Sequence, residues 1–455
     1  MENGAAYDVF IIGGGQAGIP LAHALAGESM SVALAERKNL GGSCINFGCT
    51  PTKAAIASAK VAHQARRAAE YGLRIPEVEV DFPAVLRRAK GIVEADRANL
   101  DRGFEDTDNP ELIRGHARFE GRDDAGFRLG VGERSVVARQ VILNTGTRTM
   151  IPPVSGLEGV DFIDAGNWLE KTELPGHLAI IGGGYIGLEM AQFYRRMGSR
   201  VTVVGGSSGQ VVPHEDEDVA EAIKDILEGE GIEFLFKTRA EGVESVGNGL
   251  RLRLDGGKEL EATHLFVATG RKPNIDDLGL ESVGLQVSRH GTIEVDERLA
   301  TDVEGIWAAG DIRGGPMFTH TSWDDHRVLL SQLAGDASRT TERVVPYAIF
   351  TDPELGRVGM TEREARETGY EVEVMRSEMN QDSKAYEIGE TDGFIKVVAD
   401  ASDGRILGAA VLAAEGAELV HTYIDLMNAG APYAVIRDAV HIHPTLAEAV
   451  QRTVL

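Results

Sequence analysis

A short apolar run leads into three glycines in the sequence YDVFIIGGGQAG, residues 7–18. An alanine- and leucine-rich helical pattern follows, so the segment predicts a strand, a glycine turn and a helix. In that setting G-x-G-x-x-G is the fingerprint of a dinucleotide pyrophosphate bound at a helix N-terminus, here formed by Gly13, Gly15 and Gly18. A second apolar strand, residues 31–35, delivers Glu36 where a carboxylate would bind an adenosine ribose. A glycine turn alone is structural about as often as not, but strand, helix and Glu36 together favour nucleotide binding.

The same pattern occurs a second time in LAIIGGGYIG, residues 178–187. Two complete fingerprints are much more specific than one, and they predict a flavin nucleotide in the first unit and a nicotinamide nucleotide in the second. The next strand, residues 200–204, ends in the GGSSG segment, residues 205–209. This segment has neither a carboxylate for a ribose 2′-hydroxyl nor an arginine for a 2′-phosphate, so the choice between NADH and NADPH stays open.

The two cysteines, Cys44 and Cys49, are the only ones among 455 residues. In a regular helix this spacing would separate their Cα atoms by about 7.5 Å along the axis. A disulfide needs Cα atoms roughly 4.4 to 6.8 Å apart, so we expect a distorted backbone near Cys44, where Gly41, Gly42 and Gly48 give freedom. Pro51 suits the first turn of the following helix, whose dipole would stabilise a nearby thiolate.

Taken alone, the C-x4-C spacing leaves a second interpretation open. Free cysteines are commonly core residues, so two buried and inert neighbours are about equally expected. A zinc site is less favoured, because two thiolates with no second Cys or His cluster nearby fall short of four ligands. We predict no metal site.

Length and composition narrow the class of protein. A chain of 455 residues with 55 glycines and 43% hydrophobic residues indicates a turn-rich α/β enzyme of two to four domains. No apolar run reaches the ~18 residues that span a bilayer, and the N-terminus lacks the basic region of a signal peptide. Two cysteines make no secreted disulfide scaffold. We expect a soluble, cytoplasmic protein.

The formal net charge of −25 excludes some partners. Nonspecific binding to nucleic acid or to an anionic membrane needs a cationic surface, so neither is expected. The charge is also compatible with adaptation to salt, which composition alone does not decide.

The β-rich segment that ends in VILNTGT (141–147) is expected to close the first nucleotide unit. Two further segments, ATGRKPN (268–274) and GIWAAGD (305–311), follow apolar strands and are expected to return to a bound cofactor. Asp311 is placed to accept from polyol hydroxyls, although each segment alone would more often be an ordinary tight turn. His116 is expected to be structural.

After residue 346 the pattern changes to strands and helices without glycine fingerprints, which predicts a separate terminal domain. It ends in HIHPTLAEAV, residues 441–450. A lone histidine is more often a core residue than a catalytic one. However, His443 is followed by proline and then by Glu448, the arrangement expected of an oriented general acid-base.

Taken in order, these motifs resemble the flavoprotein pyridine nucleotide-disulfide oxidoreductases, the group that contains dihydrolipoamide dehydrogenase, glutathione reductase and mercuric reductase. The resemblance covers essentially the full chain. It implies an α/β fold with two Rossmann-like dinucleotide-binding domains and a C-terminal α+β dimerisation domain. The implied boundaries are 1–150 and 271–345 for the FAD-binding domain, 151–270 for the NAD(P)-binding domain and 346–455 for the dimerisation domain.

The resemblance also implies roles for individual residues. Cys44 would attack the substrate and Cys49 would lie beside the flavin and form a charge-transfer complex, while Lys53, paired with Glu189, would lie near flavin N5. His443, oriented by Glu448, would serve the cysteines of the other subunit of a homodimer. The implied FAD-binding residues are Gly13, Gly15, Gly18, Glu36, Gly42, Lys53, Ala117, Thr145, Gly146, Arg271, Gly310, Asp311 and His320. The implied NAD(P)-binding residues are Gly182, Gly184, Tyr185, which would cover the nicotinamide pocket, Ile186, Gly187 and Gly270.

The substrate does not follow from the resemblance. Mercuric reductases carry a C-terminal cysteine pair, whereas this chain ends in VQRTVL, so mercury reduction is not favoured. His443 with Glu448 suits dithiol-disulfide exchange, as in dihydrolipoamide dehydrogenase. Residues 318–327 and the Thr-Pro-Thr-Lys after Cys49 are more similar to a branch that includes proteins of reactive-chlorine and copper stress.

The main expectation is an NAD(P)H-linked, FAD-dependent oxidoreductase of a small-molecule or protein-bound disulfide or dithiol. One alternative is direct reduction of a metal ion or a quinone. An alternative of another class is a flavin-bound sensor whose cysteines signal redox state without turnover. The physiological substrate and the direction of reaction stay open.

Overall fold

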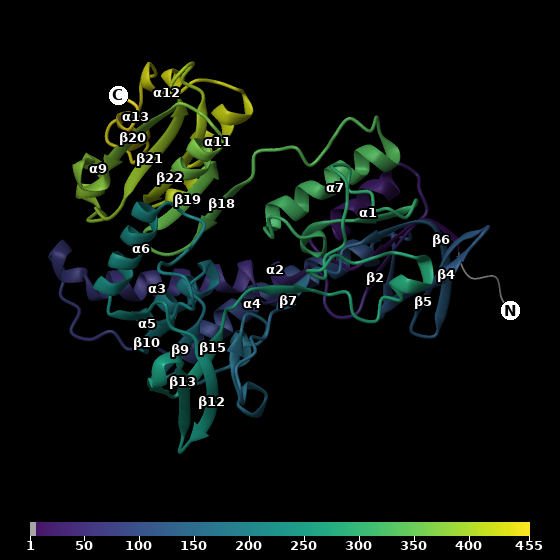
Figure 1. Ribbon diagram of the computed structural model, residues 1–455, viewed down its shortest axis with the longest axis horizontal. Coiled ribbons are helices and arrows are strands. Elements are labelled where there is room, and N and C mark those ends of the chain that lie inside the picture. The colour runs from purple at the N-terminus through teal and green to yellow at the C-terminus, as the bar shows by residue number, and fades with distance from the viewer. Residues whose placement is uncertain (1–5) are drawn as a thin grey trace. The chain divides into compact units, whose positions relative to one another are not determined.

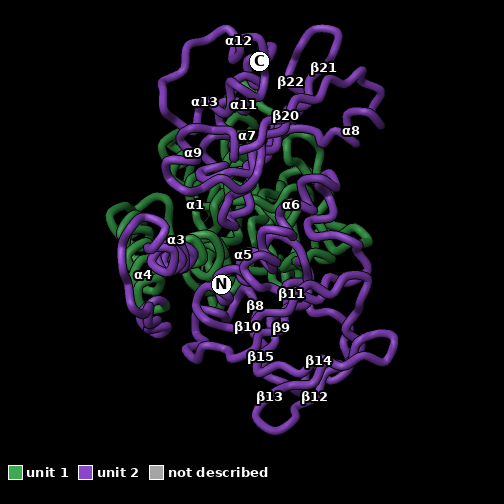
Figure 2. Tube along the Cα trace, turned by 90° about the vertical axis from the view of Figure 1, so that its left-hand side faces the viewer, with its two compact units in different colours: residues 1–54, 86–150, 271–343 green, residues 55–85, 151–270, 344–455 purple. Residues whose placement is uncertain are grey.

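The computed structural model describes residues 6–455, and the chain divides into two compact units (Figure 2). Unit 1 consists of residues 1–54, 86–150 and 271–343, and unit 2 consists of residues 55–85, 151–270 and 344–455. Unit 2 contains the expected NAD(P)-binding and dimerisation domains, and it also takes residues 55–85 from the expected FAD-binding domain. The division into three domains stays a prediction.

Unit 1 is built on a sheet whose strands run in the order β3-β2-β1-β6-β5-β4, with β17 beside β6 (Figure 1). Strands β3, β2, β1, β6 and β17 are parallel, whereas β5 pairs antiparallel with both β4 and β6. The bounds are β1 Ala6–Ile12, β2 Val32–Glu36, β3 Glu111–Arg114, β4 Ala117–Asp123, β5 Gly126–Val131, β6 Arg134–Leu143, β7 Thr147–Thr149, β16 Arg271–Pro273 and β17 Ile306–Ala308.

The almost uninterrupted apolar character of β1 follows from its central place in this sheet. A strand covered on both faces buries every side chain, and successive side chains point to opposite faces. Accordingly Phe10 and Ile12 belong to one buried cluster, while Val9 and Ile11 belong to the other. The sheet therefore holds the carboxyl end of β1 rigidly, where the first glycine turn begins.

Unit 2 contains the second nucleotide unit and the C-terminal segment. Its parallel sheet has the order β11-β10-β9-β15-β8, and a smaller antiparallel sheet has the order β12-β13-β14. The C-terminal part is an antiparallel sheet of order β18-β19-β22-β21-β20. The bounds are β8 Ile163–Asp164, β9 His177–Ile181, β10 Arg200–Val204, β11 Ile232–Leu235, β12 Ala240–Val246, β13 Gly249–Leu254, β14 Glu259–Ala262, β15 His264–Val267, β18 Pro346–Ile349, β19 Glu354–Gly359, β20 Val372–Glu378, β21 Phe394–Asp400 and β22 Ile406–Ala413.

The helices follow the glycine turns and fill the connections between strands. Helices α3 and α4 are separated by a 3-10 turn and an irregular stretch. The bounds are α1 Gly18–Gly27, α2 Gly42–Asn46, α3 Cys49–Arg66, α4 Phe82–Glu105, α5 Tyr185–Met197, α6 Glu217–Gly229, α7 Thr319–Ala334, α8 Glu362–Glu367, α9 Ser383–Glu387, α10 Gly416–Leu419, α11 His421–Asn428, α12 Ala434–Arg437 and α13 Ala447–Arg452.

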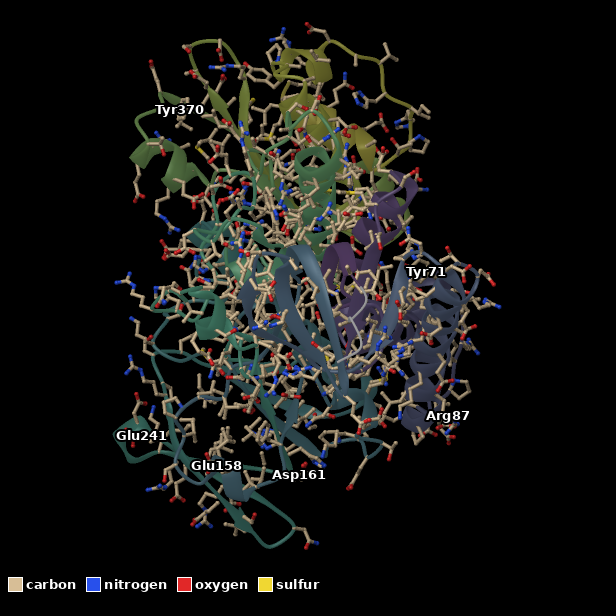
Figure 3. All side chains as sticks on the ribbon, turned by 90° about the vertical axis from the view of Figure 1, so that its right-hand side faces the viewer. Tyr71, Arg87, Glu158, Asp161, Glu241 and Tyr370 are labelled. Carbon is tan, nitrogen blue, oxygen red and sulfur yellow. The ribbon has the colours of Figure 1, made fainter. Side chains whose placement is uncertain are left out.

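Much of the negative charge lies at the surface. In unit 2 the side chains of Glu158, Asp161 and Glu241 are exposed (Figure 3). None of the helices within residues 6–455 combines the length and the hydropathy that a bilayer crossing requires.

Candidate active site

The first glycine turn has the geometry that its sequence predicts. Gly13 follows β1 with φ +110°, and a Cβ there would lie 2.3 Å from the carbonyl oxygen of Asn144. A Cβ on Gly18 would lie 2.3 Å from the carbonyl oxygen of Gly13. Only glycine fits both positions, and the turn leads directly into α1, where backbone N–H groups suit a pyrophosphate.

Asn144 holds this turn in place, although none of the sequence motifs pointed to this residue. Its buried Oδ1 accepts from the Gly18 N–H at 3.0 Å, and its Nδ2 donates to the Ala309 carbonyl oxygen at 2.9 Å. One feature of the sequence could have predicted this role: a polar residue directly follows the apolar end of β6. A buried polar side chain at that place needs a hydrogen-bond partner.

Glu36 stands at the end of β2 with both carboxylate oxygens oriented by the backbone. Oε2 accepts from the Gly14 N–H at 2.9 Å and Oε1 from the Lys38 N–H at 2.7 Å. Strand β3 pairs with β2 at Glu36, and the buried Ala117 begins β4 soon after. The carboxylate is thus held beside the glycine turn, as a ribose ligand would be.

Residues from three other strand ends meet in unit 1. The Thr145 hydroxyl donates to the Asn274 carbonyl oxygen at 2.7 Å, and Gly146 accepts from the Asn274 N–H at 2.9 Å. Arg271 binds Oδ2 of Asp311 at 2.8 Å. These contacts join the three segments that the sequence assigned to cofactor binding.

Asp325 supports the turn at Gly310, a role for which the sequence contains no signal. This aspartate is fully buried in α7, and its Oδ2 accepts from the Gly310 N–H at 2.8 Å and from Arg313 Nε at 2.9 Å. Arg343 Nη2 contacts Oδ1 at 2.5 Å. Two arginines offset the cost of burying one carboxylate, which fixes Gly310 and Asp311 in place.

The cysteine segment is distorted between the two thiols, as expected. Cys44 lies in α2, the chain breaks its helical path at Phe47 and Gly48, and Cys49 opens α3 with Pro51 in the first turn. A Cβ on Gly48 would lie 2.9 Å from the Ser43 carbonyl oxygen, so this break needs glycine.

Both cysteines are thiols rather than halves of a disulfide, and the Thr319 hydroxyl lies beside Cys49. Cys44 is half-buried, Cys49 is exposed, and Cys49 Sγ lies 3.1 Å from the Thr319 hydroxyl at the start of α7. The pKa of Cys44 is raised, first by its hydrogen bond to the Cys49 thiol and then by burial, while Thr319 and Lys53 act in the opposite direction. A pair so close together loses one proton much more readily than two.

Three further residues that are expected to bind the flavin lie near this segment in the chain or next to Thr319. Gly42 has φ +60°, and its Cβ position is 3.1 Å from Gly15 Cα, so the start of α2 approaches the first glycine turn closely. Lys53 is a half-buried residue of α3. His320, next to Thr319, is exposed and stacks on Phe318 with ring centroids 5.5 Å apart.

The second glycine turn, in unit 2, repeats the first. Gly182 has φ +119°, and its Cβ position lies 2.3 Å from the Ala268 carbonyl oxygen. A Cβ on Gly187 would lie 2.1 Å from the Gly182 carbonyl oxygen, whereas Gly184 faces open space. Tyr185 and Ile186 are half-buried in the first turn of α5, and Gly270 follows β15 with φ +114°.

The proposed acid-base residues occur as expected, each in unit 2. His443 Nδ1 lies 3.0 Å from Glu448 Oε2, and the imidazole is 69% exposed. The pKa of Glu448 is lowered by the Thr445 N–H and by His443. Glu189 is buried in α5, where its Oε1 accepts from the Phe350 N–H at 3.0 Å. The pairing of Glu189 with Lys53 stays a prediction.

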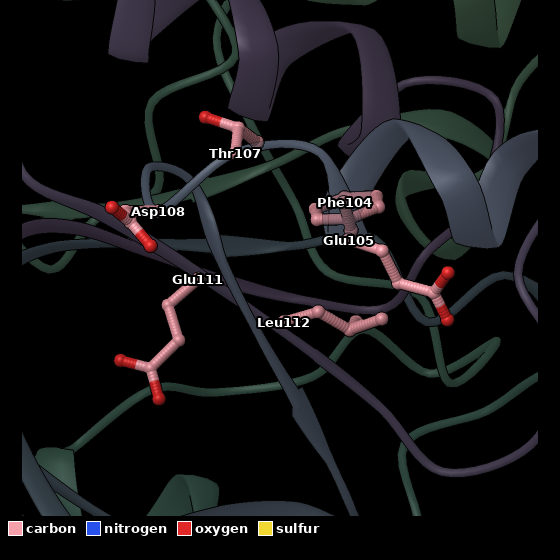
Figure 4. A pocket seen from close by; sticks show the side chains of 6 residues that line it. All are labelled: Phe104, Glu105, Thr107, Asp108, Glu111 and Leu112. Atoms are coloured by element: carbon pink, nitrogen blue, oxygen red, sulfur yellow. The ribbon is translucent and has the colours of Figure 1, made fainter.

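A separate hollow in unit 1 has no feature of a reaction site. It has a volume of about 430 Å³ and is lined by Phe104, Glu105, Thr107, Asp108, Glu111 and Leu112 (Figure 4). It does not include the cysteines or either glycine turn. Among residues 6–455 no group of three or more His, Cys, Asp or Glu side chains is arranged to bind a metal.

The residues of unit 1 fit a dinucleotide. Two glycines that tolerate no Cβ shape the turn, an oriented carboxylate stands at the ribose position, and Asp311 uses Oδ2 for Arg271, so it has a second oxygen to offer a ligand hydroxyl. Unit 2 has a glycine turn of the same geometry, but no carboxylate stands at the position equivalent to Glu36.

Comparison with known proteins places these features in one family. The family model for pyridine nucleotide-disulphide oxidoreductases matches residues 7–325, and the model for the dimerisation domain of the same family matches residues 345–454. The probable pyridine nucleotide-disulfide oxidoreductase RclA of Escherichia coli strain K12 is 34% identical over 449 residues, 98% of each chain. A dihydrolipoyl dehydrogenase of Halobacterium salinarum is 33% identical over 451 residues, 97% of this chain and 94% of the relative.

A solved structure gives the same result. The Cu(II) complex of the HOCl-induced flavoprotein disulfide reductase RclA from Escherichia coli superposes with a TM-score of 0.90 at 33% identity, covering 100% of this chain and 99% of that one. This likeness confirms the predicted fold of two dinucleotide-binding domains and a dimerisation domain. The chain therefore belongs to the pyridine nucleotide-disulfide oxidoreductases, enzymes that use FAD and NAD(P)H.

Proposed function

We propose that the protein is an NAD(P)H-dependent disulfide oxidoreductase that works through a reversible Cys44–Cys49 disulfide. The observation that carries this proposal is the neighbouring pair of thiols, Cys44 in α2 and Cys49 at the start of α3, with Thr319 3.1 Å from the Cys49 sulfur. The protein would act as a homodimer in the cytoplasm, where a reducing environment suits cysteines that must cycle.

The cofactors would be bound by the two glycine turns. Gly13, Gly15, Gly18, Glu36 and Asp311 would hold FAD, and Gly182, Gly184 and Gly187 would hold the nicotinamide nucleotide, in an FAD-binding domain of residues 1–150 and 271–345 and an NAD(P)-binding domain of residues 151–270. Bound FAD would relay an electron pair from NAD(P)H to the cysteine disulfide.

The two thiols would then carry out exchange with the substrate. The Cys44 thiolate attacks one sulfur of the substrate disulfide, forming a mixed disulfide and expelling the other sulfur as a thiolate. Cys49 attacks the Cys44 sulfur, which closes the Cys44–Cys49 disulfide and releases the second substrate thiolate. Two protons complete the substrate dithiol.

His443 would supply and receive the protons. Glu448 accepts from its Nδ1, which leaves Nε2 for the reacting sulfur. By this arrangement imidazole takes the Cys44 proton before attack and returns it to the leaving thiolate.

Steady-state oxidation of NADH and NADPH with a panel of disulfides tests the proposal. Sustained turnover with a disulfide, lost in Cys44→Ser, is the expected result. Turnover only with Cu(II) or quinones would support the second candidate, which the Cu(II) complex of the RclA structure favours. No turnover with any acceptor would support a flavin-bound redox sensor.

A further inference from the structure

The GGSSG segment occupies the place where the adenosine ribose binds in a dinucleotide unit. Gly205 directly follows β10, and its Cα lies 3.8 Å from the Cβ position of Gly183 in the second glycine turn. The Val212 N–H donates to the Gly183 carbonyl oxygen at 3.1 Å. The segment is therefore packed beside the turn that would hold the pyrophosphate.

A carboxylate side chain at position 205 would require the Phe236 ring to shift. A Cβ on Gly205 would lie 2.9 Å from Cδ1 and 3.3 Å from Cε1 of the Phe236 ring. This ring also stacks on Phe234 with centroids 5.5 Å apart, so it cannot yield easily. In unit 1 the equivalent position holds Glu36, and the two nucleotide units thus differ where the ribose 2′-substituent would lie.

A cation approaches the segment from the neighbouring strand. Lys237 follows β11, which pairs in parallel with β10. The Lys237 N–H donates to the Ser208 carbonyl oxygen at 3.2 Å, and the Thr238 N–H donates to that of Gly206 at 2.9 Å. These bonds fix the Lys237 backbone, and its exposed side chain places Cε 3.2 Å from the Cβ position of Gly209.

The first carboxylate after the GGSSG segment in the chain is already paired with other residues. Glu215 is 1% exposed and is bound to Arg357 at 3.1 Å and to the Tyr347 hydroxyl. His214 contributes its carbonyl oxygen to Arg363. Small residues with hydroxyl groups and one ammonium group form a surface suited to a phosphate.

We infer that Lys237, with the exposed Ser207 hydroxyl, binds the 2′-phosphate of NADPH and makes this nucleotide the preferred hydride donor. The inference rests on the proposed function, because it assigns the nicotinamide nucleotide to the second glycine turn. It identifies a cation for the 2′-phosphate, which the segment after β10 lacks. This cation, Lys237, follows the neighbouring strand β11.

Binding of 2′,5′-ADP and 5′-ADP to the purified holoenzyme, measured by calorimetry, tests the site without turnover. We expect the 2′-phosphorylated nucleotide to bind at least about tenfold more tightly, the scale of one charge-assisted hydrogen bond. Lys237→Gln should remove most of that difference and Lys237→Arg should keep it. Equal binding of both nucleotides, or discrimination that survives in Lys237→Gln, would overturn the inference.

Reduction of ferricyanide with NADPH or NADH gives the kinetic counterpart and does not require the cysteine pair. Lys237→Gln should raise the KM for NADPH about tenfold and leave the KM for NADH unchanged. Lys224→Gln, on α6 of the same unit, is the matched control for loss of one positive charge, and it should change neither value. Equal effects of Lys237→Gln on both nucleotides would contradict the assigned contact.

The two hypotheses fail in different ways. If disulfides are not reduced but 2′,5′-ADP is still discriminated through Lys237, the disulfide function is wrong and the nucleotide site stands. If disulfides are reduced with NADH preferred, the function stands and the Lys237 assignment is wrong.

Discussion

At the scale of single residues, the proposed chemistry involves two sulfur atoms and one hydroxyl group. Cys44 and Cys49 are close enough to share a hydrogen bond, and Thr319 lies 3.1 Å from Cys49 Sγ. Their surroundings therefore control which sulfur ionises first.

Replacing Cys49 tests its proposed place beside the flavin. We expect Cys49→Ser to abolish the long-wavelength absorption band of the two-electron-reduced enzyme, because a serine hydroxyl is not ionised and is a poor electron donor. The band is measured by anaerobic reductive titration. Cys44→Ser should retain it, and an unchanged band in Cys49→Ser would refute the assignment.

Replacing Thr319 tests its effect on the thiols. The Thr319 hydroxyl lowers the pKa of Cys44, so Thr319→Val should shift ionisation of the reduced pair to higher pH. The shift is read from the pH dependence of alkylation by iodoacetamide, followed by mass spectrometry. Thr319→Ser keeps the hydroxyl and should resemble the wild type; coincident profiles of all three proteins would exclude the role.

At the scale of elements, a buried ion network anchors α5 within unit 2. Arg196, whose side chain is 5% exposed, binds Asp352 at 2.7 Å and Glu230 at 2.7 Å. Burial alone would raise the pKa of Asp352, but the charge and hydrogen bonds of Arg196 outweigh burial and lower it from 3.8. The helix that begins at the second glycine turn is thus held by charge as well as by apolar packing.

Asp352→Asn should destabilise unit 2 by about 3 kcal/mol at pH 7, because it removes one partner of a buried pair. A lowered folded-state pKa adds stability above the unfolded-state value, and this stability is lost as the pH falls through the folded-state pKa. The difference between the two proteins should therefore shrink below pH 4.

Urea denaturation followed by fluorescence measures this effect in a background with Trp307→Phe and Trp323→Phe. The remaining tryptophan, Trp168, is fully buried and its ring lies 6.0 Å from Phe193 of α5. Asp161→Asn is the control, because Asp161 is 83% exposed in its pair with Lys171 and should cost less than about 0.5 kcal/mol. A difference between wild type and Asp352→Asn that does not depend on pH would contradict the ionic origin.

At the scale of the whole molecule, the proposed reaction needs two chains. The chain contains the dimerisation domain of its family at residues 345–454, and this segment includes His443 and Glu448. The imidazole is largely exposed and available to a second chain.

Mixing two inactive variants tests this arrangement. In a mixed dimer of Cys44→Ser and His443→Gln, one site lacks both groups and the other has both intact. Random re-association should therefore restore about a quarter of wild-type disulfide reduction, since half the dimers are mixed and each has one intact site. Each variant alone should retain ferricyanide reduction. No recovery in verified mixed dimers would show that His443 does not serve the cysteines of its partner.

The sequence by itself determined the elements that depend on neighbouring residues. Both glycine turns could be predicted because strand, turn and helix are continuous in the chain, and the break between Cys44 and Cys49 followed from the spacing of two thiols. Glu36 was predictable for the same reason.

Only the tertiary structure decided which distant residues support these turns. Asn144 accepts from the Gly18 N–H, 126 residues away, and Asp325 accepts from the Gly310 N–H, 15 residues away. The sequence does not show which backbone group each of these polar side chains binds. Lys237 reaches the GGSSG segment because β10 and β11 are adjacent parallel strands. Local sequence specifies backbone conformation, whereas the pairing of strands brings charges from separate segments to one ligand.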